Sequence, residues 1–201
     1  EIILFNNNSS DDIEIFCKKF SEKFHFFKCY SSRKDLKAGN SLNAALKYAN
    51  GDYISYMGDD DQIIYDRFDL LDDYLIRYNN PDIILGNFIR CEIDENQFVR
   101  SLDLNSSSKE VLFDTQKLRY EHLEKLSIYC GGSFTIKKNI YSGILRKFKY
   151  YSSPQGVEFF IFRSSLFFAK NILITNYPLF LMGRSKTSVG KIAFDNNGKN
   201  N

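Results

Sequence analysis

From its first residues the chain alternates short apolar runs with segments of helical periodicity. The apolar runs predict strands over residues 2–5, 24–30, 53–57 and 82–85. Between them, apolar residues recur every three or four positions, which predicts amphipathic helices over residues 13–23, 42–49 and 68–78. Strands and helices in alternation are typical of a mostly parallel sheet with crossover helices. The first half therefore predicts an α/β fold.

The second half has a less regular pattern. Its apolar runs predict a hairpin over residues 88–91 and 97–100 and later strands over residues 133–136, 172–174 and 179–182. Helices are expected over residues 118–126, 140–148 and 157–170. A Ser- and Asn-rich segment at 102–110 indicates a seam. We therefore expect a first half at 1–100, a smaller mixed half at 101–190, and a disordered tail at 191–201.

Composition narrows the function classes. The formal net charge of +2 over 201 residues gives no reason to expect a nucleic-acid partner. No apolar run approaches the roughly 18 residues of a membrane span. The four cysteines form no C-x-x-C pair, which predicts reduced, structural thiols in a cytosolic protein; they are Cys17, Cys29, Cys91 and Cys130.

Three consecutive carboxylates, Asp59, Asp60 and Asp61, follow the strand predicted over residues 53–57. Their mutual repulsion is commonly offset by a hard divalent cation, which prefers oxygen ligands. Ligands of α/β sheets also gather beyond the carboxyl ends of strands. The triplet therefore predicts a cation site at the sheet rim, with a solvated loop or a helix N-terminus as the plain alternative.

Three motifs occur in a fixed order. The first strand ends in Asn6-Asn7-Asn8-Ser9-Ser10-Asp11. A helix containing Asn43 leads into Gly51-Asp52-Tyr53-Ile54, and the next strand ends in Met57-Gly58-Asp59-Asp60-Asp61. This order resembles the family 2 glycosyltransferases, which have the GT-A fold. A looser similarity to bacterial members that build surface polysaccharides covers Pro154 to Phe160, Pro178-Leu179 and Gly183 to Ser188.

The resemblance implies a role for each matching residue. Asn6 and Asn8 would approach the base and ribose of a nucleotide sugar, and Lys37 would approach its diphosphate. Asn43 would steady the neighbouring loop. Asp61 would ligate Mn²⁺ or Mg²⁺ with Asp59, while Asp59 or Asp60 supports the ribose or the metal's waters. Glu158 would be the general base. Each role has a plain alternative. Residues 6–10 would be a turn and helix cap, and Lys37 a surface lysine. Asn43 would hydrogen-bond within its helix region, and Glu158 would be an acid that the macrodipole favours near a helix start.

The activity that the resemblance implies is metal-assisted, inverting transfer of a sugar from a nucleoside-diphosphate sugar. The acceptor would be a saccharide or a lipid-linked saccharide. Residues 1–100 would be the donor-binding half and residues 101–190 the acceptor-binding half. The implied location is the cytoplasm, with peripheral association at the inner face of the membrane as a further expectation. The sequence does not indicate the oligomeric state.

The chain also departs from the family pattern. Asn6 stands where the family usually has Asp, Gly58 where many members have Asp, and Glu158 where Asp is the commoner base. The family's opening strand, ending in Pro-x-Tyr-Asn, has no counterpart, which predicts an incomplete domain. Two alternatives stay open: a non-catalytic remnant that binds nucleotides or sugars, and a Mg²⁺-dependent phosphoryl-handling α/β protein.

Overall fold

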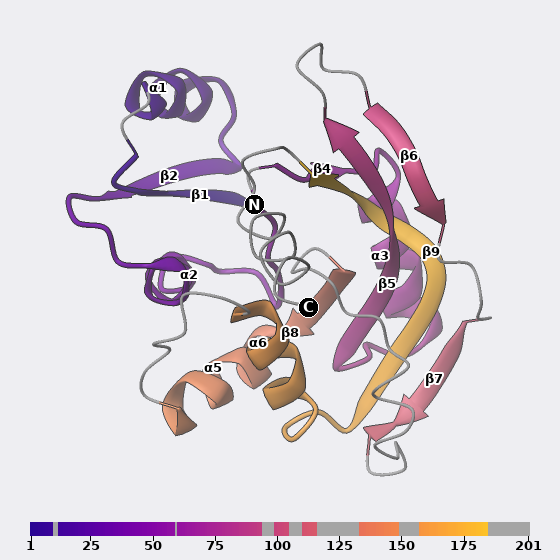
Figure 1. Ribbon diagram of the computed structural model, residues 1–201. Coiled ribbons are helices and arrows are strands. Elements are labelled where there is room, and N and C mark those ends of the chain that lie inside the picture. Colours follow the sequence, from indigo (N-terminus) through magenta and orange to yellow (C-terminus); the bar gives the residue numbers. More distant parts are fainter. Residues whose placement is uncertain are drawn as a thin grey trace, which may run out of the picture. The chain divides into compact units, whose positions relative to one another are not determined.

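The computed structural model describes residues 1–9, 12–58, 60–93, 99–104, 110–115, 133–148 and 157–184 (Figure 1). The chain forms two compact units. The first comprises Glu1–Ile54 and Lys137–Phe168, and the second comprises Ser55–Ile136 and Ala169–Asn201. Compactness thus groups residues 137–168 with the N-terminal segment. The functional division at residue 100 stays a prediction.

The first unit is built on a parallel strand pair. Strand β1 (Ile2–Asn7) pairs with β2 (Phe27–Ser32) in a register that runs from Ile2 opposite Phe27 to Asn7 opposite Ser32. Helix α1 (Ile13–Lys23) makes the crossover, and α2 (Ala38–Leu46) follows β2. In Figure 1, α1 and α2 lie on opposite sides of the strand pair. The same unit contains α5 (Lys138–Lys147) and α6 (Val157–Ser165).

The apolar face of α1 packs on β2 through aromatic rings and a disulfide. Phe20 lies with its ring centroid 4.2 Å from that of Phe16 and 5.8 Å from that of Phe27. Cys17 and Cys29 are disulfide-bonded, with their Cα atoms 5.6 Å apart. The expectation of reduced thiols is therefore wrong for this pair, because sequence spacing does not reveal which cysteines face each other across a helix–strand contact.

The other two cysteines have separate outcomes. Cys91 is a buried free thiol, and burial raises its pKa. Cys130 lies outside the described residues.

A mixed sheet forms the second unit. Strand β3 (Tyr53–Ser55), whose last residue opens this unit, begins the order β3-β8-β5-β9-β4, while β6 pairs with β5 and β7 pairs with β9. Within the described part of this sheet, β5 with β9 is the only parallel pair among those with a defined register. The other strands are β4 (Gln62–Ile63), β5 (Ile83–Ile93), β6 (Val99–Leu104), β7 (Val111–Asp114), β8 (Phe134–Lys137) and β9 (Asn171–Arg184).

Helix α3 (Arg67–Arg77) covers the β5–β9 pair. The core of this layer is fully or nearly fully buried and consists of Leu71, Tyr74, Ile84, Phe88, Leu173, Leu179 and Phe180. The two central strands approach closely where their register shifts, around Gly86. A Cβ atom at Gly86 would lie 2.3 Å from two side-chain carbons of Leu179, so only glycine fits there.

The α/β prediction is confirmed, and several elements differ in extent. Strand β5 joins the run predicted at 82–85 to the first hairpin strand, and β9 joins two predicted strands into one. The hairpin itself is present, with Ile93 opposite Val99. Strand β4 was not predicted because it has only two residues, and the four-residue strand β7 was not predicted either. The helix predicted at 118–126 and the tail at 191–201 lie outside the described residues.

Candidate functional site

The acidic loop after β3 is fastened to the second unit's sheet through Asp61. One carboxylate oxygen of Asp61, Oδ2, accepts a hydrogen bond from the Gly58 amide at 3.2 Å. The other, Oδ1, accepts one from the Gly183 amide in β9 at 3.1 Å. Backbone donors from two elements therefore fix the orientation of this carboxylate before any ligand arrives.

Gly58 brings a second carboxylate to the same place. A Cβ atom at Gly58 would lie 2.9 Å from Oδ1 of Asp60 and 3.4 Å from Oδ2 of Asp61. The two carboxylates thus converge on the backbone at Gly58, and a side chain at this position would require them to shift. Asp59 lies outside the described residues.

The acidic loop fits a hard cation in its donor chemistry. Mg²⁺ and Mn²⁺ prefer carboxylate oxygens, and Mg²⁺ is usually bound by one or two carboxylates together with substrate phosphates and water. Within the described ranges, which leave out Asp59, no group of three or more His, Cys, Asp or Glu side chains could hold a metal ion.

In the first unit, the loop after β1 is shaped by Asn6 and Asn8. Asn6 is 8% exposed, and its side-chain oxygen accepts a hydrogen bond from the Ser9 amide at 2.9 Å. Asn8 has a φ of 64°, in the left-handed region that Asn tolerates better than most residues. Asn6 therefore closes the turn, and Asn8 reverses the chain at the carboxyl end of β1.

Two residues that the sequence interpretation missed join this loop to the one after β2. The Asn7 side chain donates to Oδ1 of Asp35 at 3.0 Å and accepts from the Leu36 amide at 2.8 Å. Asn7 and Ser32 are partners at the end of the strand pair, so both loops start from the same edge. The sequence could have indicated this contact, because polar residues at the carboxyl ends of neighbouring parallel strands meet at one edge of the sheet.

Lys37 is held in an unusual backbone conformation by Asp35. Its φ of 65° and ψ of 159° lie in a region that is essentially reserved for glycine and costs about 1–3 kcal/mol. The Asp35 carboxylate accepts from the Lys37 amide at 2.8 Å and from its Nζ at 2.5 Å. The Lys37 side chain, followed by the Lys37 amide, lowers the pKa of Asp35. Lys37 is thus paired with Asp35 and largely exposed at the start of α2.

Two other predicted site residues lie on helices. Asn43 is half-buried on α2. Glu158 is the second residue of α6, and its side chain lies outside the described part of the chain. The structure therefore places Glu158 near a helix start without describing where its carboxylate points.

A buried arginine was also missed. Arg67, the first residue of α3, is 2% exposed, and burial lowers its pKa to about 10. One guanidinium nitrogen donates to the Ser55 hydroxyl at 2.9 Å, and within the described residues the buried Nε has no hydrogen-bond partner. Arg67, Leu71 and Tyr74 share the core-facing side of α3, so the sequence signal was a cation at an apolar position.

A comparison with family models decides the assignment. The model described as glycosyl transferase family 2 matches residues 1–145, which is most of the chain. The chain belongs to glycosyl transferase family 2. The matched segment includes the loops after β1, β2 and β3.

Relatives with curated names come from bacterial surface-polymer and glycosyltransferase proteins. The minor teichoic acid biosynthesis protein GgaB of Bacillus subtilis is 29% identical over 85 residues, which is 42% of this chain and 9% of that protein. The glycosyltransferase GlyA of Streptococcus pneumoniae is 28% identical over 123 residues, which is 61% of this chain and 17% of that protein. This family 2 chain thus spans less than a fifth of either relative.

Solved structures confirm the GT-A fold. TarS residues 1–349 of S. aureus in complex with UDP-GlcNAc has a TM-score of 0.70 at 13% identity, covering 94% of this chain and 50% of that one. The complex of the same TarS segment with UDP has a TM-score of 0.67, also at 13% identity, covering 92% and 51%. At this identity the likeness concerns the fold. None of the helices within the described ranges is both long and apolar enough to cross a membrane.

Proposed function

We propose that this family 2 chain transfers a sugar from a nucleoside-diphosphate sugar to a saccharide or lipid-linked acceptor, with a divalent metal and inversion at the sugar carbon. The observation that carries the proposal is the pair of carboxylates, Asp60 and Asp61, that converges on Gly58 at the end of β3. Support comes from family membership and from the structural neighbour that binds UDP-GlcNAc.

The metal would be Mn²⁺ or Mg²⁺, bound by Asp61 and Asp59, with Asp60 supporting the ribose or the metal's waters. When bound, it would neutralise the negative charge that develops on the departing diphosphate. The amides of Gly58 and Gly183 would help Asp61 to bind the metal, because they hold its carboxylate in one orientation. Asp61 then needs no rearrangement to bind the ion, which favours affinity.

The nucleotide would be bound in the first unit. Asn6 and Asn8 shape the loop assigned to the base and ribose, and Asn43 on α2 supports it. Lys37 is assigned to the diphosphate. Because Asp35 holds Lys37 in a strained conformation, the charge of Lys37 is already positioned. Such strain is typical of residues kept for binding.

Glu158 is assigned as the general base. An acceptor hydroxyl has a high pKa and is a weak nucleophile, so it needs a base in line with the attack. Its oxygen would form a bond to the sugar carbon as the bond to the diphosphate oxygen breaks. The hydroxyl proton would pass to Glu158, and the nucleoside diphosphate would leave. Attack opposite the leaving group gives inversion.

The metal and donor assignment is tested by the Asp61→Asn variant. We expect UDP, GDP or CDP to raise the unfolding temperature of the 201-residue chain only with Mn²⁺ or Mg²⁺, because ligand binding to the native state stabilises it. Asp61→Asn should remove this shift. Asp72→Asn, at an exposed position of α3, makes the same charge change and should retain it. Failure of all three nucleotides in the folded wild type would refute the donor site.

The base assignment is tested by Glu158→Gln. We expect nucleotide-dependent stabilisation to persist while transfer falls by about 10²–10⁴-fold, the usual contribution of a positioned base. Glu14→Gln, at an exposed position of α1, is the matched control and should transfer the sugar at the wild-type rate. Normal transfer by Glu158→Gln would remove Glu158 from the mechanism. Nucleotide binding without any transfer by the wild type would favour the non-catalytic remnant instead.

A further inference from the structure

The α5 and α6 segments of the first unit are strongly basic, although the whole chain is nearly balanced. Residues 137–148 and 157–168 contain five Lys or Arg residues and a single acidic residue, Glu158, whereas the chain carries a net charge of +2. Both segments belong to the same compact unit. Such a local excess of one sign indicates a surface that attracts anions.

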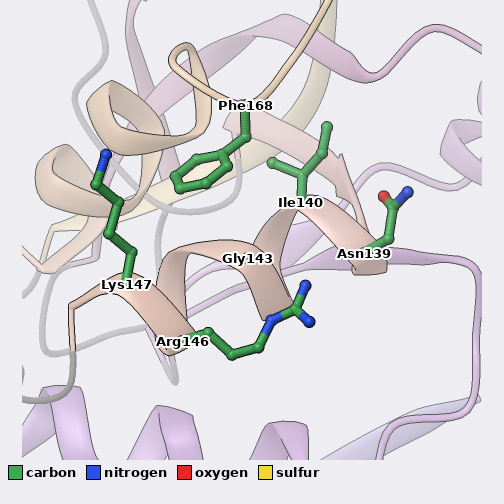
Figure 2. A pocket seen from close by; sticks show the side chains of 6 residues that line it. All are labelled: Asn139, Ile140, Gly143, Arg146, Lys147 and Phe168. Carbon is green, nitrogen blue, oxygen red and sulfur yellow. The ribbon is translucent and has the colours of Figure 1, made fainter.

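A pocket lies within this basic region (Figure 2). Its volume is about 440 Å³, within the range of small-molecule sites. Figure 2 shows the Phe168 ring beside Gly143, with Lys147 extending from the C-terminal end of α5 on one side and Arg146 running back along the helix on the other. A Cβ atom at Gly143 would lie 3.3 Å from Cδ1 of Phe168, so the glycine gives the ring its place. The lining residues are Asn139, Ile140, Gly143, Arg146, Lys147 and Phe168.

The two cations of the pocket have no acidic partner in the described part of the chain. Neither Arg146 nor Lys147 forms an ion pair there. The Lys147 ammonium lies 5.7 Å from the ring centroid of Phe168 and 5.8 Å from that of Phe148. Aromatic rings attract this charge without neutralising it. The pocket therefore presents positive charge beside an apolar ring.

This combination selects a class of ligand. A guanidinium binds phosphate oxygens through two parallel hydrogen bonds, and an ammonium adds a point charge. The carboxamide of Asn139 can donate or accept a further hydrogen bond. Phe168 and Ile140 offer an apolar surface, which inorganic phosphate alone would leave unused. The complementary ligand has an anionic head and an organic body.

We propose that this pocket binds the phosphate group of an organic phosphate ester, with the charges of Arg146 and Lys147 attracting the phosphate and the Phe168 ring against the organic part. The same chemistry is found in soluble glycerol phosphates and in phospholipid headgroups. The neighbouring Phe167 is 85% exposed. The site uses none of the residues assigned to the nucleotide sugar and does not rest on the proposed transfer activity.

The experiment measures binding by the intact chain to two probes. One is glycerol 3-phosphate, followed by calorimetry with glycerol as the neutral reference. The other is phosphatidylcholine vesicles with or without phosphatidylglycerol, followed by co-sedimentation. The double variant Arg146→Gln/Lys147→Gln should bind at least roughly tenfold more weakly, as expected when charged hydrogen bonds are lost. Lys18→Gln/Lys19→Gln, at two exposed positions of α1, removes the same charge from the same unit and should bind like the wild type.

A second variant separates a shaped pocket from general electrostatic attraction. Gly143→Leu fills the space beside Phe168, keeps every charge, and suits a helix interior better than glycine does. It should also weaken binding by roughly tenfold. Circular dichroism checks that each variant is folded, and Lys147→Gln alone replaces the double variant if that one is not.

Each outcome decides for or against the proposal. Binding of glycerol 3-phosphate that is lost in both pocket variants supports it with a soluble ester as the source. Binding only to the anionic vesicles, lost in the same variants, supports it with a lipid headgroup as the source. Binding to neither probe overturns it. The proposal is also overturned if Lys18→Gln/Lys19→Gln weakens binding as much as the pocket variants do, or if Gly143→Leu binds like the wild type.

Discussion

At the scale of single residues, the described structure contains one charge whose burial is not balanced by an acid. Arg67 is nearly fully buried, its guanidinium donates to hydroxyl groups of Ser55 and Thr135, and its Nε is unsatisfied within the described residues. Its pKa of about 10 keeps it protonated at neutral pH. Burying a charge without an acid is costly, and replacing buried ions by apolar residues is often neutral or stabilising.

We therefore expect Arg67→Met to keep or raise the free energy of unfolding, measured by urea denaturation. Ser55 and Thr135 stay satisfied in that variant, because their hydroxyl oxygens are 2.6 Å apart and hydrogen-bond each other. Arg67→Ala is the control and should be less stable, because it also leaves a cavity. A loss of about 3 kcal/mol or more in Arg67→Met would contradict this reasoning and would mean that an anion compensates the arginine.

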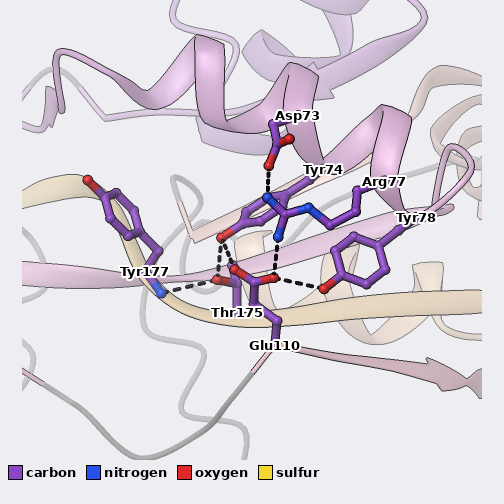
Figure 3. Close-up of polar contacts among 7 residues, drawn as sticks. All are labelled: Asp73, Tyr74, Arg77, Tyr78, Glu110, Thr175 and Tyr177. Atoms are coloured by element: carbon purple, nitrogen blue, oxygen red, sulfur yellow. Dashed lines mark hydrogen bonds and ion pairs between the residues drawn. The ribbon is translucent and has the colours of Figure 1, made fainter.

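At the scale of elements, α3 is joined to β9 and to the segment before β7 by one chain of hydrogen bonds (Figure 3). The Tyr177 amide donates to the Thr175 hydroxyl at 3.1 Å, and that hydroxyl lies 2.7 Å from the Tyr74 hydroxyl. Tyr74 donates to Glu110 at 3.0 Å. Glu110 also accepts from Arg77 at 2.9 Å and from Tyr78 at 2.7 Å. A satisfied network of this kind fixes how a helix sits on its sheet.

The network predicts a pH dependence that belongs to Tyr74. Burial, opposed by Thr175 and reinforced by Glu110, raises the pKa of Tyr74 from 10.0 to about 12. Between these values the unfolded tyrosine loses its proton while the folded one keeps it. The native state then binds more protons, so the free energy of unfolding falls as the pH rises.

Tyr74→Phe isolates this effect. Below pH 10 the wild type should be more stable by about 1–3 kcal/mol, because the variant leaves Glu110 and Thr175 short of a partner. This advantage should shrink as the pH rises from 10 towards 12, since phenylalanine does not titrate. Urea denaturation of both proteins across this range measures the difference, and all other titrating groups cancel. A constant difference would contradict the assignment to Tyr74.

The elements also show what the sequence could and could not predict. Periodicity located α1 and α3 to within a residue, because each has one apolar face and a polar remainder. It could not show that β5 and β9 are continuous through Gly86 and Pro178, since both residues read as strand breaks. It placed the acidic loop correctly after a strand, but it ended the first strand at Phe5, whereas Asn6 and Asn7 are the last two residues of β1. It missed Asn7 and Asp35, whose meeting depends on strand pairing between segments 28 residues apart.

At the scale of the whole molecule, the chain passes between its two compact units three times, at Ile54, Ile136 and Phe168. Each unit therefore contains segments distant in sequence, and a constraint within one unit should act mainly on that unit. The disulfide between Cys17 and Cys29 is such a constraint, because both cysteines belong to the first unit. It closes a short loop from α1 to β2.

We expect reduction of this disulfide to destabilise the first unit by about 2–4 kcal/mol, the usual effect of closing a loop of this length. Hydrogen exchange with and without dithiothreitol measures it: amides of β1, β2 and α1 should lose protection, whereas those of α3 and β5 should change little. Cys17→Ala/Cys29→Ala should exchange like the reduced wild type and should not respond to the reductant. Cys91→Ala, at the buried free thiol of the second unit, should still respond. Equal loss of protection in both units would mean that they unfold as one cooperative body, and the disulfide would then stabilise the entire chain.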